Sequence, residues 1–401
     1  MVNKRKFIPE GVEDINAAEF EKKEWIQLKI KELFKRFGYK QIQTPTFEYY
    51  NLFSEIDSAI DTEDMYKLID ASGKILVLRP DVTIPIARMI ATKYDSVEEY
   101  LKFMYFTPVF RSSDFRAGGK REFLQAGIEY LGNPNPEADA EVIVTAISTL
   151  KNMGFNSIHI DMGQTDYFKG IMKEINIEQN IKNSIRKLIE DKNFADLGHF
   201  LDSQDIDDVY KNLLSEVPYL YGDFGEIALK VKERSINETM QNSADNLLKI
   251  YRIIEEYGYA KYVFADLGLI NHLDYYSGMI FKGYIENYGK PVISGGRYDD
   301  LFKKFGKEVP ATGFGINSDE IFEAAEQYQL LDNFDYAKGY LILYDTLHRK
   351  WAFRRSMELR FSGYVVETKQ VECCINDLKE TYGQSGYNKV IAAIGNDIIE
   401  F

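Results

Sequence analysis

The feature that most constrains the fold is a pair of apolar-rich segments, residues 102–111 and 121–131, joined by the charged, glycine-containing loop SSDFRAGG. Runs of aromatic and β-branched residues of this length are typical of strands. A connection this short joins two strands as an antiparallel hairpin, because a parallel pair needs a longer crossover. We therefore predict a long hairpin within a main domain of the α+β class, built on an antiparallel sheet.

Helical patterns surround these strands. Residues 17–37 place their apolar side chains on one stripe that stops at Gly38, and a second helix begins near Pro136. Residues 167–257 are polar and helical without convincing strands, which predicts an inserted helical subdomain. Further strands are expected at 157–163, 262–269, 278–285 and 291–296, followed by a helix that starts at Ser318.

The last part of the chain follows a different pattern. After Asp335, strand-like and helix-like segments alternate from GYLILYD to KVIAAIG, which indicates a small separate α/β domain. We therefore divide the chain into residues 1–330, which include the helical insertion, and residues 335–401. Residues 332–401 contain 9 Lys or Arg against 10 Asp or Glu. This part therefore lacks the basic excess of an RNA-reading surface.

Composition disfavours several classes of function. The chain has 401 residues and a formal net charge of −14, whereas gripping nucleic acid through phosphates needs a basic face. It contains no run of about 18 apolar residues that could span a membrane, and MVNKRKFIPEG lacks the apolar core of a signal peptide. Cys373 and Cys374 are adjacent and the four histidines are scattered, so we predict neither a disulfide framework nor a metal site. A cytoplasmic location follows.

Four stretches place polar groups in apolar surroundings, where polar groups are costly unless they are used. They are LRPDVTIPIAR (78–88), FR (110–111) with REFLQAGIEY (121–130), LDYYSG (273–278) and SGGRYDDL (294–301). Each stretch has a plain structural alternative. Glu129 could pair with Arg111 across the hairpin, Tyr275 and Tyr276 could be core residues, and the glycine pair of SGGRYDDL could form only a tight turn.

Taken together, the four stretches predict one pocket. Asp81, Thr83 and Gln125 can surround an ammonium group. Glu129, which shares a strand face with Gln125 by two-residue alternation, can bind one nitrogen of an imidazole while the hydroxyl of Tyr275 or Tyr276 binds the other. The glycines at positions 295 and 296 would let the backbone approach a small ligand closely. The residues therefore predict a histidine-type pocket.

The order of motifs resembles the class II aminoacyl-tRNA synthetases of the histidyl type. The resemblance covers about residues 7–330 and rests on PEGVEDI, FGYKQIQTPTFEYYNLF, LRPDVT, FRSSDFRAGGKREFLQAGIEY, LDYYSG, GGRYDDL and GFGINSDEIF. It implies an antiparallel sheet flanked by helices, a helical insertion and a C-terminal domain in the position of an anticodon-binding domain. It also implies that Asp81 (usually glutamate), Thr83 and Gln125 hold the amino group of histidine, while Glu129 and Tyr276 read the imidazole. Arg111 is our candidate for the histidine carboxylate.

The chain departs from the synthetases where they bind ATP. Glu320 and Asn271 stand where the synthetases have arginines, and Ser113 stands where they have an acidic contact to adenine. Two further loop arginines correspond to Asp114 and Gly119. A carboxylate in place of a cation reverses an interaction of roughly 4 kcal/mol per unit pair at about 4 Å and an effective dielectric near 20. The resemblance therefore implies a site that keeps the amino acid and loses ATP, with no catalytic residue and no cofactor.

PEGVEDI, LRPDVTIPIAR and FRSSDFRAGGKREFLQAGIEYLG are closer to a second family, the regulatory subunits of ATP phosphoribosyltransferase. That resemblance implies a non-catalytic subunit that partners a short-form catalytic subunit in the first step of histidine biosynthesis. It also implies that L-histidine binds as feedback inhibitor. Two alternatives stay open: a divergent but active histidyl-tRNA synthetase, and an RNA-binding or signalling module that reuses the fold.

The resemblance also bears on self-association. Class II relatives pair through the segment that corresponds to residues 38–53, which implies a homodimeric core. Residues 40–50 read as a strand that carries Pro45, and proline suits an edge or an interface because it cannot donate to a central ladder. The alternative is a monomer with Pro45 on a free edge.

Overall fold

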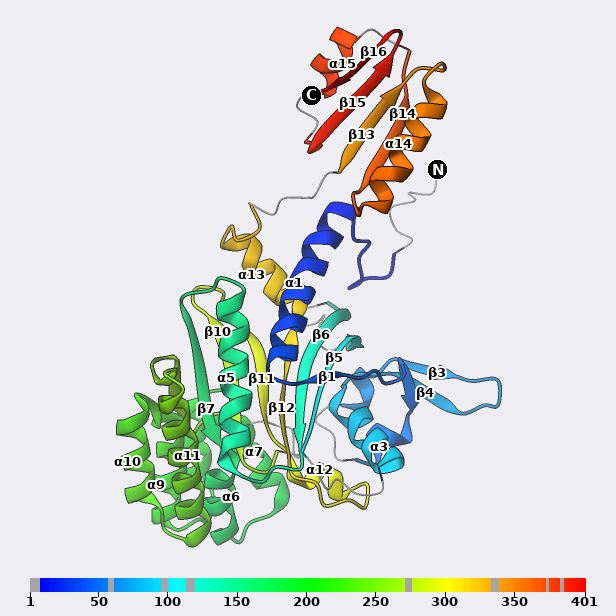
Figure 1. Cartoon of the computed structure of the whole chain (residues 1–401). Helices are drawn as coiled ribbons and strands as arrows, with labels where there is room; N and C mark the ends of the chain where they lie inside the picture. The colour runs from blue at the N-terminus through cyan, green and yellow to red at the C-terminus, as the bar shows by residue number, and fades with distance from the viewer. Residues whose placement is uncertain are drawn as a thin grey trace. The chain divides into compact units, whose positions relative to one another are not determined.

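The computed structural model describes residues 8–56, 61–94, 100–112, 120–270, 276–332, 339–372, 375–382 and 386–401. The chain forms two compact units, Met1–Leu330 and Leu331–Phe401. Figure 1 colours the chain from blue at its N-terminus to red at its C-terminus. Each unit has a sheet of its own, and the predicted site residues all belong to the first.

A nine-stranded sheet forms the centre of the first unit (Figure 1). In spatial order its strands are β1 (Lys40–Gln41), β5 (Leu101–Phe110), β6 (Glu122–Leu131), β12 (Ala311–Asn317), β11 (Pro291–Arg297), β10 (Met279–Ile285), β7 (Ile158–Gln164), β9 (Val263–Asp266) and β8 (Tyr221–Gly222). All neighbouring pairs are antiparallel except β1–β5 and β7–β9. The predicted hairpin is the β5–β6 pair. The predicted α+β class with an antiparallel sheet is confirmed.

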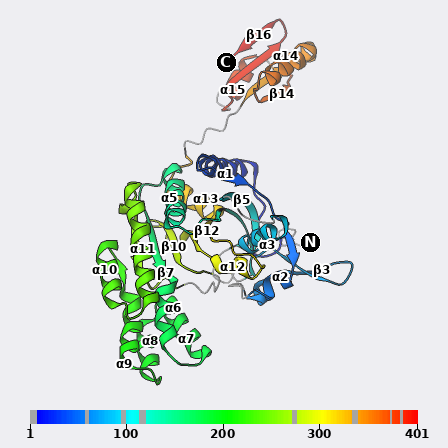
Figure 2. The same cartoon turned by 60° about the horizontal axis from the view of Figure 1, so that its bottom comes forward.

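Three helices cover one face of this sheet: α1 (Ala17–Arg36), α5 (Pro136–Asn152) and α13 (Ser318–Gln327) (Figures 1 and 2). Helix α1 begins where the side chain of Asn16 accepts a hydrogen bond from the Glu19 backbone N–H at 3.1 Å. It ends just before Gly38, whose φ of +86° favours glycine. Its buried apolar residues recur at helical spacing: Ile26, Ile30, Leu33 and Phe34.

The helical insertion follows β7. It comprises α6 (Thr165–Glu174), α7 (Gln179–Glu190), α8 (Phe194–Asp202), α9 (Asp208–Glu216), α10 (Phe224–Arg234) and α11 (Glu238–Glu256), with 3₁₀ turns at Val217–Tyr219 and Ala260–Tyr262. The expectation of a strand-free insertion is wrong at one point, because β8 pairs with β9. A two-residue strand is too short to show alternation. No helix in the described parts of the chain is long and apolar enough to cross a membrane.

A three-stranded sheet lies beside the hairpin, in the order β2 (Phe47–Tyr49), β4 (Ile75–Leu78), β3 (Lys67–Ile69). The short helix α2 (Asn51–Ser54) follows β2, a 3₁₀ turn (Thr62–Asp64) precedes β3, and α3 (Thr83–Lys93) follows β4. The single strand expected across residues 40–50 is wrong: β1 and β2 belong to different sheets. Pro45 lies between them, and the buried guanidinium of Arg79 binds the carbonyls of Thr44 (2.8 Å) and Pro45 (2.9 Å) there.

The second unit has a four-stranded sheet in the order β14 (Val366–Gln370), β13 (Tyr340–Tyr344), β15 (Lys389–Ile394), β16 (Asp397–Glu400). Alternate residues of β13 face opposite sides, so Leu341 and Leu343 belong to one core cluster and Ile342 and Tyr344 to another. Helix α15 (Ile375–Tyr382) packs with the first cluster and α14 (Arg349–Phe361) with the second. The predicted α/β alternation is present, and β16 is an addition that the sequence pattern did not predict.

Candidate ligand-binding site

The candidate site lies on the sheet face that α1, α5 and α13 leave uncovered. Gln125 and Glu129 of β6 are cross-strand partners of Asn317 and Gly313 on β12. A Cβ atom at Gly313 would collide with the Glu129 carboxylate, and one at Gly315 would lie 2.5 Å from Gln125 Nε2. The glycines of β12 therefore form a floor on which these two polar side chains lie.

Glu129 is the centre of the site. Its carboxyl group is only 2 % exposed and accepts hydrogen bonds from Thr83 Oγ1 at 2.9 Å and from the Tyr298 hydroxyl. The side-chain contacts of Glu129 are thus with hydroxyl groups, whereas the guanidinium of Arg111 binds the Pro80 carbonyl and acts on Asp81. Burial raises the pKa of Glu129 to about 8, although both hydroxyl contacts oppose that shift. This shift favours the protonated form of Glu129 around neutral pH.

Asp81 and Thr83 lie at the start of α3, a helix that the sequence pattern did not predict. Asp81 Oδ1 accepts a hydrogen bond from the Ile84 backbone N–H at 2.8 Å, so this carboxylate also caps the first turn of the helix. Burial raises the pKa of Asp81, while the Arg111 guanidinium acts against that shift. Arg111 donates from Nε to the Pro80 carbonyl at 2.7 Å. The structure therefore places Thr83 against Glu129, with Asp81 close enough to affect the pKa of Glu129, and Arg111 beside Asp81.

Gln125 carries the clearest sign of a missing partner. Its Oε1 atom is buried and accepts no hydrogen bond from any described residue. Buried polar atoms are satisfied in nearly all native structures, so an orphaned acceptor of this kind indicates a ligand or water. An ammonium group is a donor that fits this oxygen.

Tyr276 closes another part of the site. It is 7 % exposed, and its ring lies against Gly296, where an added Cβ would come within 2.9 Å of the ring. Its backbone carbonyl accepts a hydrogen bond from Lys169 Nζ at 2.7 Å. Tyr276 also interacts electrostatically with Tyr105. Tyr275 lies outside the described residues.

Two tyrosines of the site were missed from the sequence. Tyr105 is paired with Gly127 in the β5–β6 register, and its ring occupies the space that a Gly127 side chain would need. Tyr298 belongs to the GGRYDDL stretch, of which only the glycines were used. Hairpin register could have indicated Tyr105. The contact between Tyr298 and Glu129 spans 169 positions in the sequence and had no local signal.

Comparison with known proteins identifies the family. The family model described as histidyl-tRNA synthetase matches residues 11–321. A curated relative from Acetivibrio thermocellus is an ATP phosphoribosyltransferase regulatory subunit, 39 % identical over 90 % of this chain and 86 % of its own. Another, from Caldanaerobacter subterraneus, bears the same name at 38 % identity over 93 % and 97 %. This chain belongs to the family of ATP phosphoribosyltransferase regulatory subunits.

Solved structures agree with this family. A protein from Bacillus halodurans C, titled ATP phosphoribosyltransferase regulatory subunit/histidyl-tRNA synthetase, has a TM-score of 0.84 at 29 % identity and covers 98 % of this chain and 99 % of its own. The histidyl-tRNA synthetase of Nostoc has a TM-score of 0.81 at 17 % identity over 98 % and 96 %, which shows the shared fold. The class II synthetase-like fold and the regulatory-subunit resemblance are both confirmed.

In this regulatory-subunit family member, Glu320 lies in the first turn of α13. Its carboxylate accepts hydrogen bonds from the Tyr288 hydroxyl and from Lys290 Nζ at 3.3 Å. The neighbouring Asp319 forms an ion pair with Lys23 at 3.0 Å. Acidic residues suit a helix N-terminus, where the dipole is positive. Asn271, Ser113, Asp114 and Gly119 lie outside the described residues.

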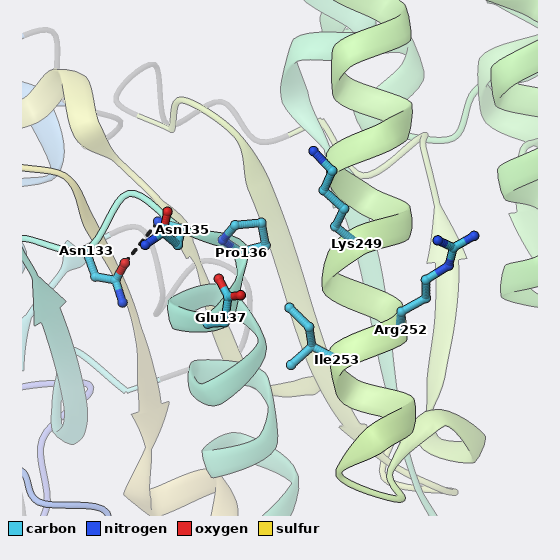
Figure 3. Close-up of a pocket in the computed structure, with 7 residues that line it drawn as sticks. All are labelled: Asn133, Asn135, Pro136, Glu137, Lys249, Arg252 and Ile253. Carbon is cyan, nitrogen blue, oxygen red and sulfur yellow. Dashed lines mark hydrogen bonds between the residues drawn. The ribbon is translucent and has the colours of Figure 1, made fainter.

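A separate cavity of about 640 Å³ lies between α5 and α11 and contains none of the predicted site residues. It is lined by Asn133, Asn135, Pro136, Glu137, Lys249, Arg252 and Ile253. Figure 3 shows the Arg252 side chain pointing away from α5, and Asn133 hydrogen-bonded to Asn135. Among the described residues, no group of three or more His, Cys, Asp or Glu side chains is arranged to hold a metal ion.

Proposed function

We propose that this chain is a non-catalytic regulatory subunit that assembles with a separate short-form ATP phosphoribosyltransferase and binds L-histidine in the pocket around Glu129. The relatives named as regulatory subunits support the role. The choice of histidine as ligand rests on one observation. The Glu129 carboxyl, which binds two hydroxyl groups, and the orphaned Gln125 Oε1 lie on the same sheet face above the glycines of β12.

In the proposed complex, the ammonium group of histidine lies between Asp81 and Gln125 Oε1. The imidazole lies between Glu129 and Tyr276, and Arg111 binds the carboxylate. Thr83 donates its hydroxyl proton to Glu129, and its oxygen keeps lone pairs that can accept a hydrogen bond from the same ammonium group. Each of the three polar groups of histidine thus has a partner of complementary charge or hydrogen-bonding character, which a buried polar ligand requires.

The pocket is not expected to perform ATP chemistry. Glu320 contributes negative charge at the first turn of α13, where it pairs with Lys290. Adenylation depends on cations that stabilise the charge of the transferring phosphoryl group. A carboxylate in that position repels a polyphosphate by roughly 4 kcal/mol per unit pair before screening.

Affinity purification of the tagged full chain from its native organism tests this function. A short phosphoribosyltransferase should co-purify, and the chain should raise the activity of that isolated subunit. Two further measurements separate the alternatives. Histidine-dependent ATP–pyrophosphate exchange by the chain alone would instead establish a synthetase, and a gel shift with tRNA at about 0.15 M salt would establish an RNA-binding module.

We also propose that the chain forms a homodimer through the three-stranded sheet. Phe47, Tyr49 and Leu68 are 54 %, 53 % and 44 % exposed. Tyr49 pairs with Leu76, and Leu76 pairs with Leu68, so these side chains share one face. An apolar face of this kind on a sheet is typical of an interaction surface. A two-fold axis would bring it against its own copy.

Light scattering at micromolar concentration is expected to give twice the 46.4 kDa mass of one chain. Phe47→Asp should lower that mass to a single chain, because a charge in the apolar face opposes pairing. Tyr257→Asp is the matched control, since Tyr257 is an aromatic residue of similar exposure (51 %) at the end of α11. A wild-type mass near 46.4 kDa would contradict the dimer.

Histidine affinity is expected to be highest between about pH 6.5 and 8. The free imidazole has a pKa of about 6.5, and burial raises the pKa of Glu129 to about 8. Between these pH values Glu129 is protonated before binding and the imidazole of the ligand is neutral. The complex therefore forms without net uptake or release of protons. Below this window the ligand must release a proton. Above it the complex must take one up, so affinity falls by up to tenfold per pH unit on either side.

Calorimetry from pH 5 to 9.5 measures this window. Glu129→Gln is the control, since it removes the titration of Glu129 and leaves that of the ligand's own amino group. The part of the high-pH decline that belongs to Glu129 should therefore be lost in the variant. Identical high-pH declines in the two proteins would contradict the prediction.

A further inference from the structure

The Glu129 carboxyl group is held on both of its oxygens by hydroxyl groups from different parts of the chain. Thr83, the first residue of α3, donates to Oε1 at 2.9 Å. Tyr298, the residue after β11, donates to Oε2. A carboxyl group with one donor can still rotate about its last bond, whereas donors on both oxygens fix its plane.

Tyr298 itself is held firmly. Its backbone N–H donates to the Ala311 carbonyl at 2.8 Å, and its ring stacks on Phe302 with an interplanar angle of 19°. The preceding residue, Arg297, forms a buried ion pair with Asp139 at 3.0 Å. Tyr298 is 2 % exposed, so solvent does not compete for its hydroxyl. Tyr298 is therefore held in place independently of its contact with Glu129.

We propose that Tyr298 is a positioning residue for ligand recognition: its hydroxyl fixes the Glu129 carboxyl so that the free side of that group faces the imidazole. Tyr298 acts through Glu129 and does not touch the ligand. The proposal deepens the histidine-binding function proposed above and rests on it for the ligand, but not for the Tyr298–Glu129 contact itself.

The contact between Tyr298 and Glu129 has a consequence for the pKa of Glu129 that can be measured without ligand. A hydroxyl that donates to a carboxylate favours the charged form, so the Tyr298 contact lowers the pKa of Glu129 against the larger effect of burial. Asp81 is the nearby carboxylate that raises this pKa, and Arg111 faces Asp81. Removing one hydroxyl leaves these other groups in place. The titration of Glu129 therefore reports on Tyr298 without any ligand.

The first experiment follows the Glu129 carboxyl by ¹³C NMR in the full-length, ligand-free protein. Tyr298→Phe removes one oxygen and should move the Glu129 titration to higher pH. Tyr288→Phe is the matched control, because the Tyr288 hydroxyl also binds a glutamate, Glu320, outside the pocket. The control should leave the Glu129 titration unchanged. A 3-fluorotyrosine placed at position 298 is a stronger donor and should move the titration to lower pH.

The second experiment measures histidine affinity of the same proteins by calorimetry. Tyr298→Phe should weaken binding by roughly 10- to 100-fold, while Tyr288→Phe should bind like the wild type. In a Glu129→Gln background, Tyr298→Phe should add little, because the group that it positions has changed. Equal additional losses in both backgrounds would show that Tyr298 acts by packing alone.

The two experiments distinguish failure of the positioning role from failure of the proposed histidine-binding function. An unchanged Glu129 titration in both Tyr298→Phe and the fluorotyrosine protein overturns the positioning role. A shifted titration in a protein that binds no histidine overturns the proposed function and leaves the Tyr298–Glu129 contact established. The fluorotyrosine protein retains the whole side chain, so it decides the question if Tyr298→Phe does not fold.

Discussion

Glu129→Gln is expected to weaken histidine binding by roughly 10- to 150-fold near pH 7. In the proposed complex, Glu129 and the imidazole share one proton, so the contact between them is a charge-assisted hydrogen bond of about 1.5–3 kcal/mol. An amide keeps the size of the side chain and its acceptor for the hydroxyl of Thr83 or Tyr298, but it cannot carry the charge. Calorimetry on the isolated full-length chain measures the change.

Glu320→Gln provides the control for this measurement. Glu320 also accepts a hydrogen bond from a tyrosine hydroxyl, and its side chain is only 16 % exposed, but it lies at the start of α13 with Tyr288 and Lys290. Its substitution should leave histidine affinity unchanged. Equal losses in Glu129→Gln and Glu320→Gln would show that the imidazole is not bound where we place it.

The main sheet could be predicted from the sequence because its strands are long. Segments such as β5 and β6 carry ten residues each, enough for apolar content and turn chemistry to identify them. The strands β1, β2, β3, β8 and β16, which were missed or merged, have two to four residues. Strands of this length are defined by their tertiary partners rather than by local pattern.

The sequence suggested which residues form the candidate site but not the hydrogen bonds between them. Asp81, Thr83, Gln125 and Glu129 were selected as candidates because polar residues in apolar surroundings are costly unless used. The contacts between them could not be predicted: Thr83 lies 46 positions from Glu129 in the sequence, and nothing local indicates that its hydroxyl donates to that carboxyl group. The charge state of Glu129 also depends on burial, which the sequence alone does not give.

The structure offers a physical route from the pocket to the proposed dimer face. Helix α3 begins at Thr83, beside Glu129, and its Arg88 forms an ion pair of 2.7 Å with Glu48 of β2. A ligand that shifts Asp81 or Glu129 therefore also acts on α3, which contacts the three-stranded sheet. Two states of such an element, biased by a ligand, are what coupling between sites requires.

In a complex reconstituted with the catalytic subunit, Glu129→Gln is expected to raise the histidine concentration needed for half-inhibition by the same 10- to 150-fold, while full activity is retained. A coupling free energy of about 1–3 kcal/mol corresponds to roughly 5- to 150-fold inhibition at saturation. Because coupling is reciprocal, substrates of the catalytic subunit should weaken histidine binding to this chain by a similar factor. Assays of the assembled complex, with and without histidine, measure both effects.

The opposing possibility is that this chain only supports the enzyme while histidine acts on the catalytic subunit. Tyr276→Phe and Glu129→Gln together separate the two, since both residues lie in the pocket and neither belongs to the catalytic chain. If inhibition by histidine were unchanged in a complex carrying both substitutions, the pocket would have no part in feedback. If activity survives and sensitivity is lost, the inhibitory signal starts in this pocket, and α3 is one element that can transmit it because Thr83 is hydrogen-bonded to the Glu129 carboxyl group.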